Sequence, residues 1–160
     1  MCKRLVAFAC LALLSAASAV AGRDDDAVIK FGLLGTWAVD CAKPPSPDNP
    51  HTSIAASWAG HPRQTTDIGT GYTQPVELRN VRIIATDRLA LLVVYVGLAE
   101  EPSFQVILAR VGARFRSHES VRRDGVALIR EGRFVDTGDP TPLFERCSRD
   151  RARLRGATGS

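Results

Sequence analysis

The chain has 160 residues, of which 45% are hydrophobic and 24% are charged, and its formal net charge at pH 7 is +4. This length accommodates one domain with a substantial core and gives no sign of a second. The charge falls to about +2 if Lys3 and Arg4 are removed with a leader, which is too small for the basic surface of a nucleic-acid-binding protein.

The first 21 residues have the organisation of a secretory signal peptide. Lys3 and Arg4 form a basic start, the uncharged run LVAFACLALL follows, and the small residues of SAASAVAG supply a cleavage pattern. The apolar run is shorter than the roughly 20 residues of a membrane-spanning helix. We therefore predict a leader over 1–21, a mature chain without a membrane span, and a periplasmic or secreted location.

The predicted cleavage determines which cysteines remain in the mature chain. Removal of the leader takes away Cys2 and Cys10 and leaves Cys41 and Cys147. An even pair in an oxidising compartment favours a disulfide. The alternative is two free thiols in a redox or metal site, although neither cysteine has a C-x-x-C partner or a ligand at metal-binding spacing. We predict a Cys41–Cys147 disulfide, no metal site and no cofactor.

The front of the mature chain is predicted to be a polar lead over 22–33, without a helix. Residues then alternate between two faces from Leu34 to Cys41, which indicates a half-buried strand. Four prolines within KPPSPDNP end this strand in a rigid loop. A weaker strand is expected over 52–60, followed by a long polar connection over 61–71.

The rest of the domain also has strand patterns. Apolar residues change parity at Arg79-Asn80, which predicts a bulge there. The continuous apolar run from Leu89 to Val96 predicts a central strand. Turns at Asp124-Gly125 and Glu131-Gly132 indicate hairpins. Further strands are expected over 104–111, on both sides of those turns and over 143–147, and a basic disordered tail over 149–160.

These segments predict an all-β fold. The domain, residues 34–148, would be a single small antiparallel meander of about eight strands. If Cys41 and Cys147 pair, the first and last strands lie side by side, because bonded cysteines have Cα atoms about 4.4 to 6.8 Å apart. The meander would then be a closed or nearly closed barrel.

Motifs of common enzyme classes are absent from the sequence. It contains no G-x-S-x-G, H-E-x-x-H, P-loop or G-x-G-x-x-G pattern. The three histidines, His51, His61 and His118, share no metal-ligand spacing. We therefore name no catalytic residue and favour a protein that is not an enzyme, while a hydrolase of unrecognised type stays open.

One strand carries a candidate binding surface. In ARFRSHESVR, simple alternation places Arg114, Arg116, His118, Ser120 and Arg122 on one face. Such a stripe could bind an acidic partner or an anionic head group. It could equally be the solvated face of an edge strand, whose charges discourage aggregation.

Aromatic side chains give a second candidate. Most of them fit a core, but Trp37 and Trp58 are placed where they could line an apolar pocket, with Trp37 closing one end of a barrel.

Gly35-Thr36-Trp37 resembles the G-x-W start of the lipocalin and calycin barrels. Thr86-Asp87 resembles their T-D motif, and Arg146 resembles the last-strand arginine that packs over the tryptophan. The chain is also similar, in part, to small periplasmic protease inhibitors with calycin-like barrels and one disulfide. These resemblances imply a barrel with Arg146 over Trp37.

A broader resemblance is to small secreted proteins of Gram-negative bacteria that begin with G-x-W-x-x-D-C, continue with an N-P-H loop and end with P-T-P-x-x-x-x-C. Here these motifs are Gly35 to Cys41, Asn49 to His51, and Pro140 to Cys147. The resemblance supports the cysteine pairing and implies no particular activity.

Together these observations predict a periplasmic or secreted, monomeric binding module for a small apolar ligand or an envelope protein. The alternatives are the unrecognised hydrolase and a structural or interaction domain without a pocket.

Overall fold

The computed structural model describes residues 24–57, 60–71, 73, 75–98 and 102–147. The predicted leader (1–21), Trp58 and the predicted tail (149–160) lie outside the described residues. One short helix precedes ten strands: α1 (Asp24–Phe31), β1 (Gly35–Ala38), β2 (His51–Ala55), β3 (Arg63–Asp67), β4 (Val76–Ala85), β5 (Arg88–Tyr95), β6 (Ser103–Val111), β7 (Arg114–Arg122), β8 (Ala127–Arg130), β9 (Arg133–Phe134) and β10 (Glu145–Arg146).

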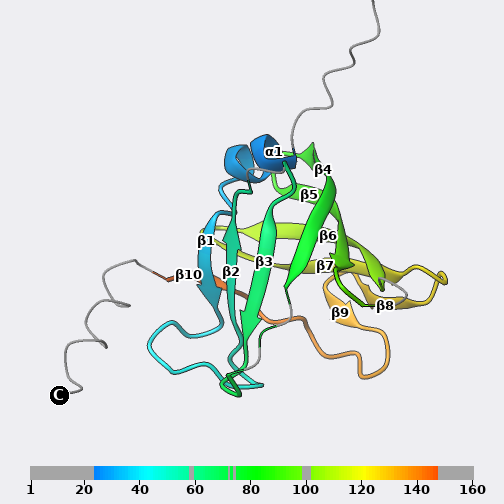
Figure 1. Cartoon of the computed structure of the whole chain (residues 1–160). Coiled ribbons are helices and arrows are strands. Elements are labelled where there is room, and N and C mark those ends of the chain that lie inside the picture. Colours follow the sequence, from blue (N-terminus) through cyan, green and yellow to red (C-terminus); the bar gives the residue numbers. More distant parts are fainter. Residues whose placement is uncertain (1–23, 58–59, 72, 74, 99–101, 148–160) are drawn as a thin grey trace, which may run out of the picture.

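All ten strands belong to one antiparallel sheet with the order β10-β1-β2-β3-β4-β5-β6-β7-β8-β9. The sheet curls into an open half-barrel, with α1 at one end (Figure 1). The predicted all-β class and antiparallel meander are thereby confirmed, and the last strand lies beside the first. No helix of the described residues is long and apolar enough to cross a membrane.

The predicted bulge in β4 is confirmed. Pairing with β5 shifts between Arg79 and Arg82, and Asn80 has a φ of 53°. Asn tolerates this left-handed conformation better than most side chains. The shift keeps Leu78 and Val81, which differ in parity, both buried.

The connection predicted over 61–71 is wrong, because it contains β3. All five residues of β3 pair with β2. Its residues on the side of buried Ile54 include Gln64 and Thr66, so apolar alternation is missing although the ladder is complete. Hydrophobic periodicity does not detect a strand of this kind, because its residues are polar and its pairing is supplied by the neighbouring strands.

The expectation that no helix follows the leader is also wrong. Acidic residues fill the first turn of α1 and Lys30 lies in the last, which matches the helix dipole. Gly32, with a φ of 75°, ends the helix, and the Leu33 N–H donates to the Val28 carbonyl. Eight residues are too few for stability alone, so tertiary contacts maintain this helix.

Two aspartates fasten α1 to β4 and to the connection between β2 and β3. Asp24 accepts a hydrogen bond from the Val81 backbone N–H (2.8 Å) through one carboxylate oxygen, and its other oxygen lies 2.7 Å from His61 Nδ1. Asp25 accepts from the Ser57 N–H at 3.2 Å. Val28 is fully buried and Phe31 nearly so, which adds the helix to the core.

The linker between α1 and β1 is held by three side-chain donors. The Trp37 indole Nε1 donates to the Leu33 carbonyl (2.8 Å), and Arg146 donates to the Leu34 carbonyl (2.8 Å). Arg110 donates to the Phe31 carbonyl and places its guanidinium 4.7 Å from the centre of the Phe31 ring. These contacts fix the path of the chain from the helix into the first strand.

Arg146 lies over Trp37, as the lipocalin resemblance implies. Its guanidinium carbon is 5.8 Å from the indole ring centre, within the range of a cation–π contact. Gly35 makes this approach possible: its φ is 120°, and a Cβ there would lie 3.3 Å from Arg146 Nε. Trp37 itself is 6% exposed and belongs to the main core cluster.

Phe144 links the last segment to the middle of the sheet. Its backbone exchanges two hydrogen bonds with Phe115 of β7, at 2.8 and 3.1 Å. The ring of Phe115 stacks on Phe144 and meets the edge of Trp37, with ring centres 5.5 and 4.8 Å apart. The segment 144–146 therefore contacts β7 on one side and β1 on the other.

We predict that Trp37→Phe lowers the free energy of unfolding by about 2 to 4 kcal/mol. The variant leaves the buried Leu33 carbonyl without its donor and creates a void beside Phe115. Urea unfolding followed by circular dichroism measures the loss, with Phe134→Leu at a half-exposed position as the control. A loss no larger than the control's would contradict this assignment.

Candidate functional site at the disulfide and the proline-rich loop

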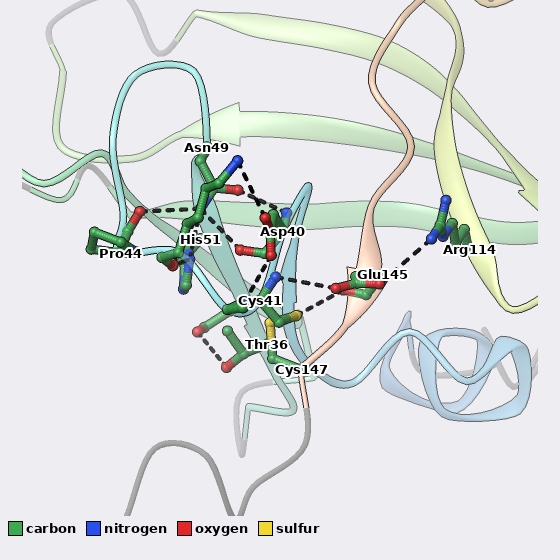
Figure 2. The surroundings of a disulfide bond; sticks show 12 residues. Thr36, Asp40, Cys41, Pro44, Asn49, His51, Arg114, Glu145 and Cys147 are labelled. Carbon is green, nitrogen blue, oxygen red and sulfur yellow. Dashed lines mark hydrogen bonds and ion pairs between the residues drawn. A yellow bond between two sulfur atoms is a disulfide. The ribbon is translucent and has the colours of Figure 1, made fainter. Parts of the chain in front are cut away.

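Cys41 and Cys147 form the predicted disulfide, with Cα atoms 5.4 Å apart. The Cys41 N–H donates to Glu145 Oε1 (3.1 Å), and the Cys147 N–H donates to the Thr36 carbonyl (2.8 Å). Figure 2 shows this cluster at the base of the loop that connects β1 with β2. The covalent bond therefore reinforces the contact between β1 and β10.

The proline-rich loop, residues 42–50, ends in a tight turn. Ser46 and Asn49 exchange two backbone hydrogen bonds, at 3.0 and 3.2 Å, around Pro47 and Asp48. Proline favours the second position of such a turn because its φ is already set near the required value. The turn is thus encoded locally by Ser-Pro-Asp-Asn.

Asn49 organises the rest of this loop from inside. Its side chain is buried, and its Nδ2 lies 3.1 to 3.3 Å from the carbonyl oxygens of Asp40, Lys43 and Pro44. Its Oδ1 accepts from the Asp40 N–H at 2.9 Å (Figure 2). One buried amide on the second arm of the loop therefore binds the backbone of the first arm at several points.

Two further contacts support the loop. His51 Nε2 lies 3.1 Å from the Lys43 carbonyl. Gly69, with a φ of 82°, packs so closely under the loop that a Cβ would lie 2.5 Å from the Pro45 carbonyl oxygen. Above these supports the loop faces solvent, with Ala42, Lys43, Pro44, Pro47 and Asp48 exposed. The arrangement is a rigid base with an exposed tip.

The predicted cationic stripe does not lie on one face. The β6–β7 register shifts, so that Ile107 pairs with Glu119 while Leu108 pairs with Ser117, and His118 is the extra residue. Ser120 pairs with Val106 and is buried. The bulge reverses the parity of β7, which places Arg114 and Arg116 opposite to Ser120 and Arg122. Simple alternation could not foresee this.

Three members of the stripe also contact other parts of the protein. Arg114 lies 3.6 Å from Glu145, which binds the Cys41 N–H. The Arg116 guanidinium packs under Gly132, where a Cβ would lie 2.8 Å from its central carbon. The His118 carbonyl accepts from the Gly132 N–H. These contacts join β7 to the β8–β9 turn and to the disulfide cluster.

The other predicted binding residue that the structure describes, Trp37, lies in the core with its indole N–H bound to Leu33. The sequence reasoning missed Asn49 and Glu145 as organisers of a site. The Ser-Pro-Asp-Asn turn was a usable signal for Asn49, whereas Glu145 lies 104 residues from its partner Cys41 and had none. Across the described ranges, no group of three His, Cys, Asp or Glu side chains is arranged to hold a metal ion.

We predict that removal of the disulfide by Cys41→Ser with Cys147→Ser lowers the free energy of unfolding by about 4 to 5 kcal/mol, as chain entropy gives for a loop of this length. The two cysteines are 106 residues apart in sequence. Urea unfolding of the oxidised protein and the double variant measures the difference. Equal midpoints would contradict the prediction.

A second prediction concerns Asp124, beside Arg122 of the former stripe. The Arg122 guanidinium and then the Val126 N–H donate to this carboxylate and lower its pKa from 3.8 to about 2. Because the folded pKa is depressed, the contribution to stability is complete above about pH 4 and is lost as the pH falls toward 2. The pair is exposed, so salt weakens it.

A carboxyl-detected NMR titration should give Asp124 a pKa of about 2 in the native protein and a higher pKa in the Arg122→Gln variant. A value near 3.8 in the native protein, or no change in the variant, would disprove the assigned cause.

The chain matches no protein-family model, no curated protein and no solved structure. No relative therefore lends it a function.

Proposed function

We propose that this chain is a periplasmic or secreted, non-catalytic module that binds a protein partner through its proline-rich loop. The observation that carries the proposal is the buried Asn49 amide, which ties the second arm of an exposed loop to the backbone of its first arm. The leader-like start and the disulfide support an oxidising compartment.

A pre-organised loop suits recognition for an energetic reason. Ordering a flexible loop on binding costs about 0.5 to 1.5 kcal/mol for each side chain that is immobilised, besides the cost in the backbone. Here the disulfide, the Ser46–Asn49 turn and the prolines have restricted the loop before any partner arrives. The exposed tip, Pro47 and Asp48, can therefore contact a partner at low entropic cost.

The packing of the half-barrel favours a protein over a small apolar ligand. Trp37, the proposed pocket residue, is enclosed in one cluster with core residues of α1 and of strands β2, β4, β5, β6 and β7. An apolar ligand beside Trp37 would have to displace those side chains. A loop on the surface needs no such rearrangement.

The His61–Asp24 pair is the observation that favours the alternative, a hydrolase, because such pairs serve as general bases. Asp24 also accepts the Val81 N–H, and both contacts fasten α1 to the sheet. We therefore assign this pair to the helix anchor.

The same proposal includes a closed, calycin-like barrel. Support comes from Arg146 over Trp37 and from the two hydrogen bonds between Phe115 and Phe144, which extend the half-barrel from β7 toward β10. Such a scaffold would keep the loop in place relative to the sheet.

Photo-crosslinking in the native cell envelope tests the loop. A photoreactive residue at Pro47 should give a discrete adduct with a protein, whereas the same residue at exposed Thr137 should not. Asn49→Ala should lower the yield of the Pro47 adduct because the loop loses its internal support. Asp48→Lys should lower the yield because it reverses the charge at the exposed tip.

Circular dichroism must show that both variants keep the fold. Equal adduct yields from Pro47 and Thr137, or yields that neither variant changes, would contradict the proposal. Co-purification of a small apolar molecule, seen by native mass spectrometry, would support the ligand-binding alternative.

A further inference from the structure

A groove crosses the outer face of the sheet, away from the proline-rich loop. It has a volume of about 450 Å³ and is lined by β4, β5, β6 and β7. This volume is within the range of sites that bind small molecules. Most of its lining residues come from two cross-strand rows and from the bulge in β4, and Ile84, Leu91 and Val106 complete the lining.

The first row places opposite charges at the two ends of the groove. Arg82 pairs with Ala90, Ala90 with Ile107, and Ile107 with Glu119, so these residues form one line across four strands. Three steps of about 4.8 Å separate the outer Cα atoms by roughly 14 Å. The floor between the charges is apolar.

The second row adds apolar surface and an amide. Leu92, Gln105 and Val121 are cross-strand neighbours in β5, β6 and β7, and all three line the groove. Asn80 lines it from the β4 bulge, where its positive φ turns the backbone out of the regular ladder. The groove thus also presents two side-chain amides, Asn80 from β4 and Gln105 from β6.

Neither charged end is neutralised within the described part of the chain. Both Arg82 and Glu119 are exposed, and neither belongs to the ion pairs found among the described residues. By contrast, the neighbouring Arg79 lies 2.8 Å from Glu77. A ligand could therefore pair with both ends without breaking an existing salt bridge.

We propose that this groove binds short apolar peptides with free termini. The peptide's ammonium group would pair with Glu119 and its carboxylate with the Arg82 guanidinium, which suits two-point binding of a carboxylate. Apolar side chains would cover Ala90, Leu92, Ile107 and Val121, while Asn80 and Gln105 would bind peptide groups.

The distance between the two charged groups limits the peptide to two or three residues. Arginine and glutamate side chains extend several ångströms from their Cα atoms, which leaves well under the 14 Å row for the ligand. An extended peptide covers about 3.3 Å per residue. Longer peptides would carry at least one terminal charge past its partner.

The test uses the tripeptide Val-Leu-Val and its acetylated, amidated form, titrated into the full chain by NMR and calorimetry. The free tripeptide should bind, and capping both of its ends should lower the affinity at least tenfold. Arg82→Gln and Glu119→Gln should each lower the affinity of the free tripeptide about tenfold, the expected loss of one charge-assisted contact.

Arg123→Gln and Glu131→Gln remove the same charges at exposed positions outside the groove and should leave the affinity unchanged within about twofold, less than the loss of one contact. The double exchange Arg82→Glu with Glu119→Arg should restore binding, because the peptide can lie in the opposite direction. Equal binding of the capped peptide, no effect of Arg82→Gln and Glu119→Gln, or no binding at millimolar concentration would each overturn the proposal.

This site is independent of the proposed partner-binding loop. Asn49→Ala should leave tripeptide affinity unchanged, and Glu119→Gln should leave the Pro47 crosslink unchanged. The two proposals can therefore fail separately.

Discussion

The hydrogen bond from the Trp37 indole to the Leu33 carbonyl is the interaction on which the rest of this structure depends. It ties the linker between α1 and β1 to Trp37, a core residue on which Phe115 and Arg146 pack from two distant parts of the chain. Arg110 and Arg146 hold the carbonyls on either side of this bond. The helix, the first strand and the last strand therefore share one support.

The bulge at His118 divides β7 into two parts with different partners. Toward Phe115, β7 bonds to Phe144 and so to the disulfide side of the sheet. Toward Ser120 it pairs with β8, and its outer face turns Glu119 into the groove. One extra residue thus separates the part that supports the scaffold from the part that lines the groove.

Sequence patterns predicted the elements whose burial alternates, and failed where contacts from elsewhere decide the structure. The β4 bulge followed from a parity change at Arg79-Asn80, and the Cys41–Cys147 bond followed from the cysteine count and the predicted compartment. The helix α1 depends on Val81 and His61, which are distant in sequence, and β3 has polar residues on its inner side. The groove could not be predicted from the sequence, because Arg82 and Glu119 come to lie on one row only through the pairing register of four strands.

Native-state hydrogen exchange tests the shared support most directly. We predict that the amides of Leu33, Phe115, Phe144 and Cys147, each hydrogen-bonded within this region, exchange only through global unfolding and share one opening free energy. The same dependence on urea should appear for a central amide such as that of Leu91. Exchange of Phe115 and Phe144 through a local opening, while Leu91 stays protected, would show that the last segment is attached independently and does not share the support at Trp37.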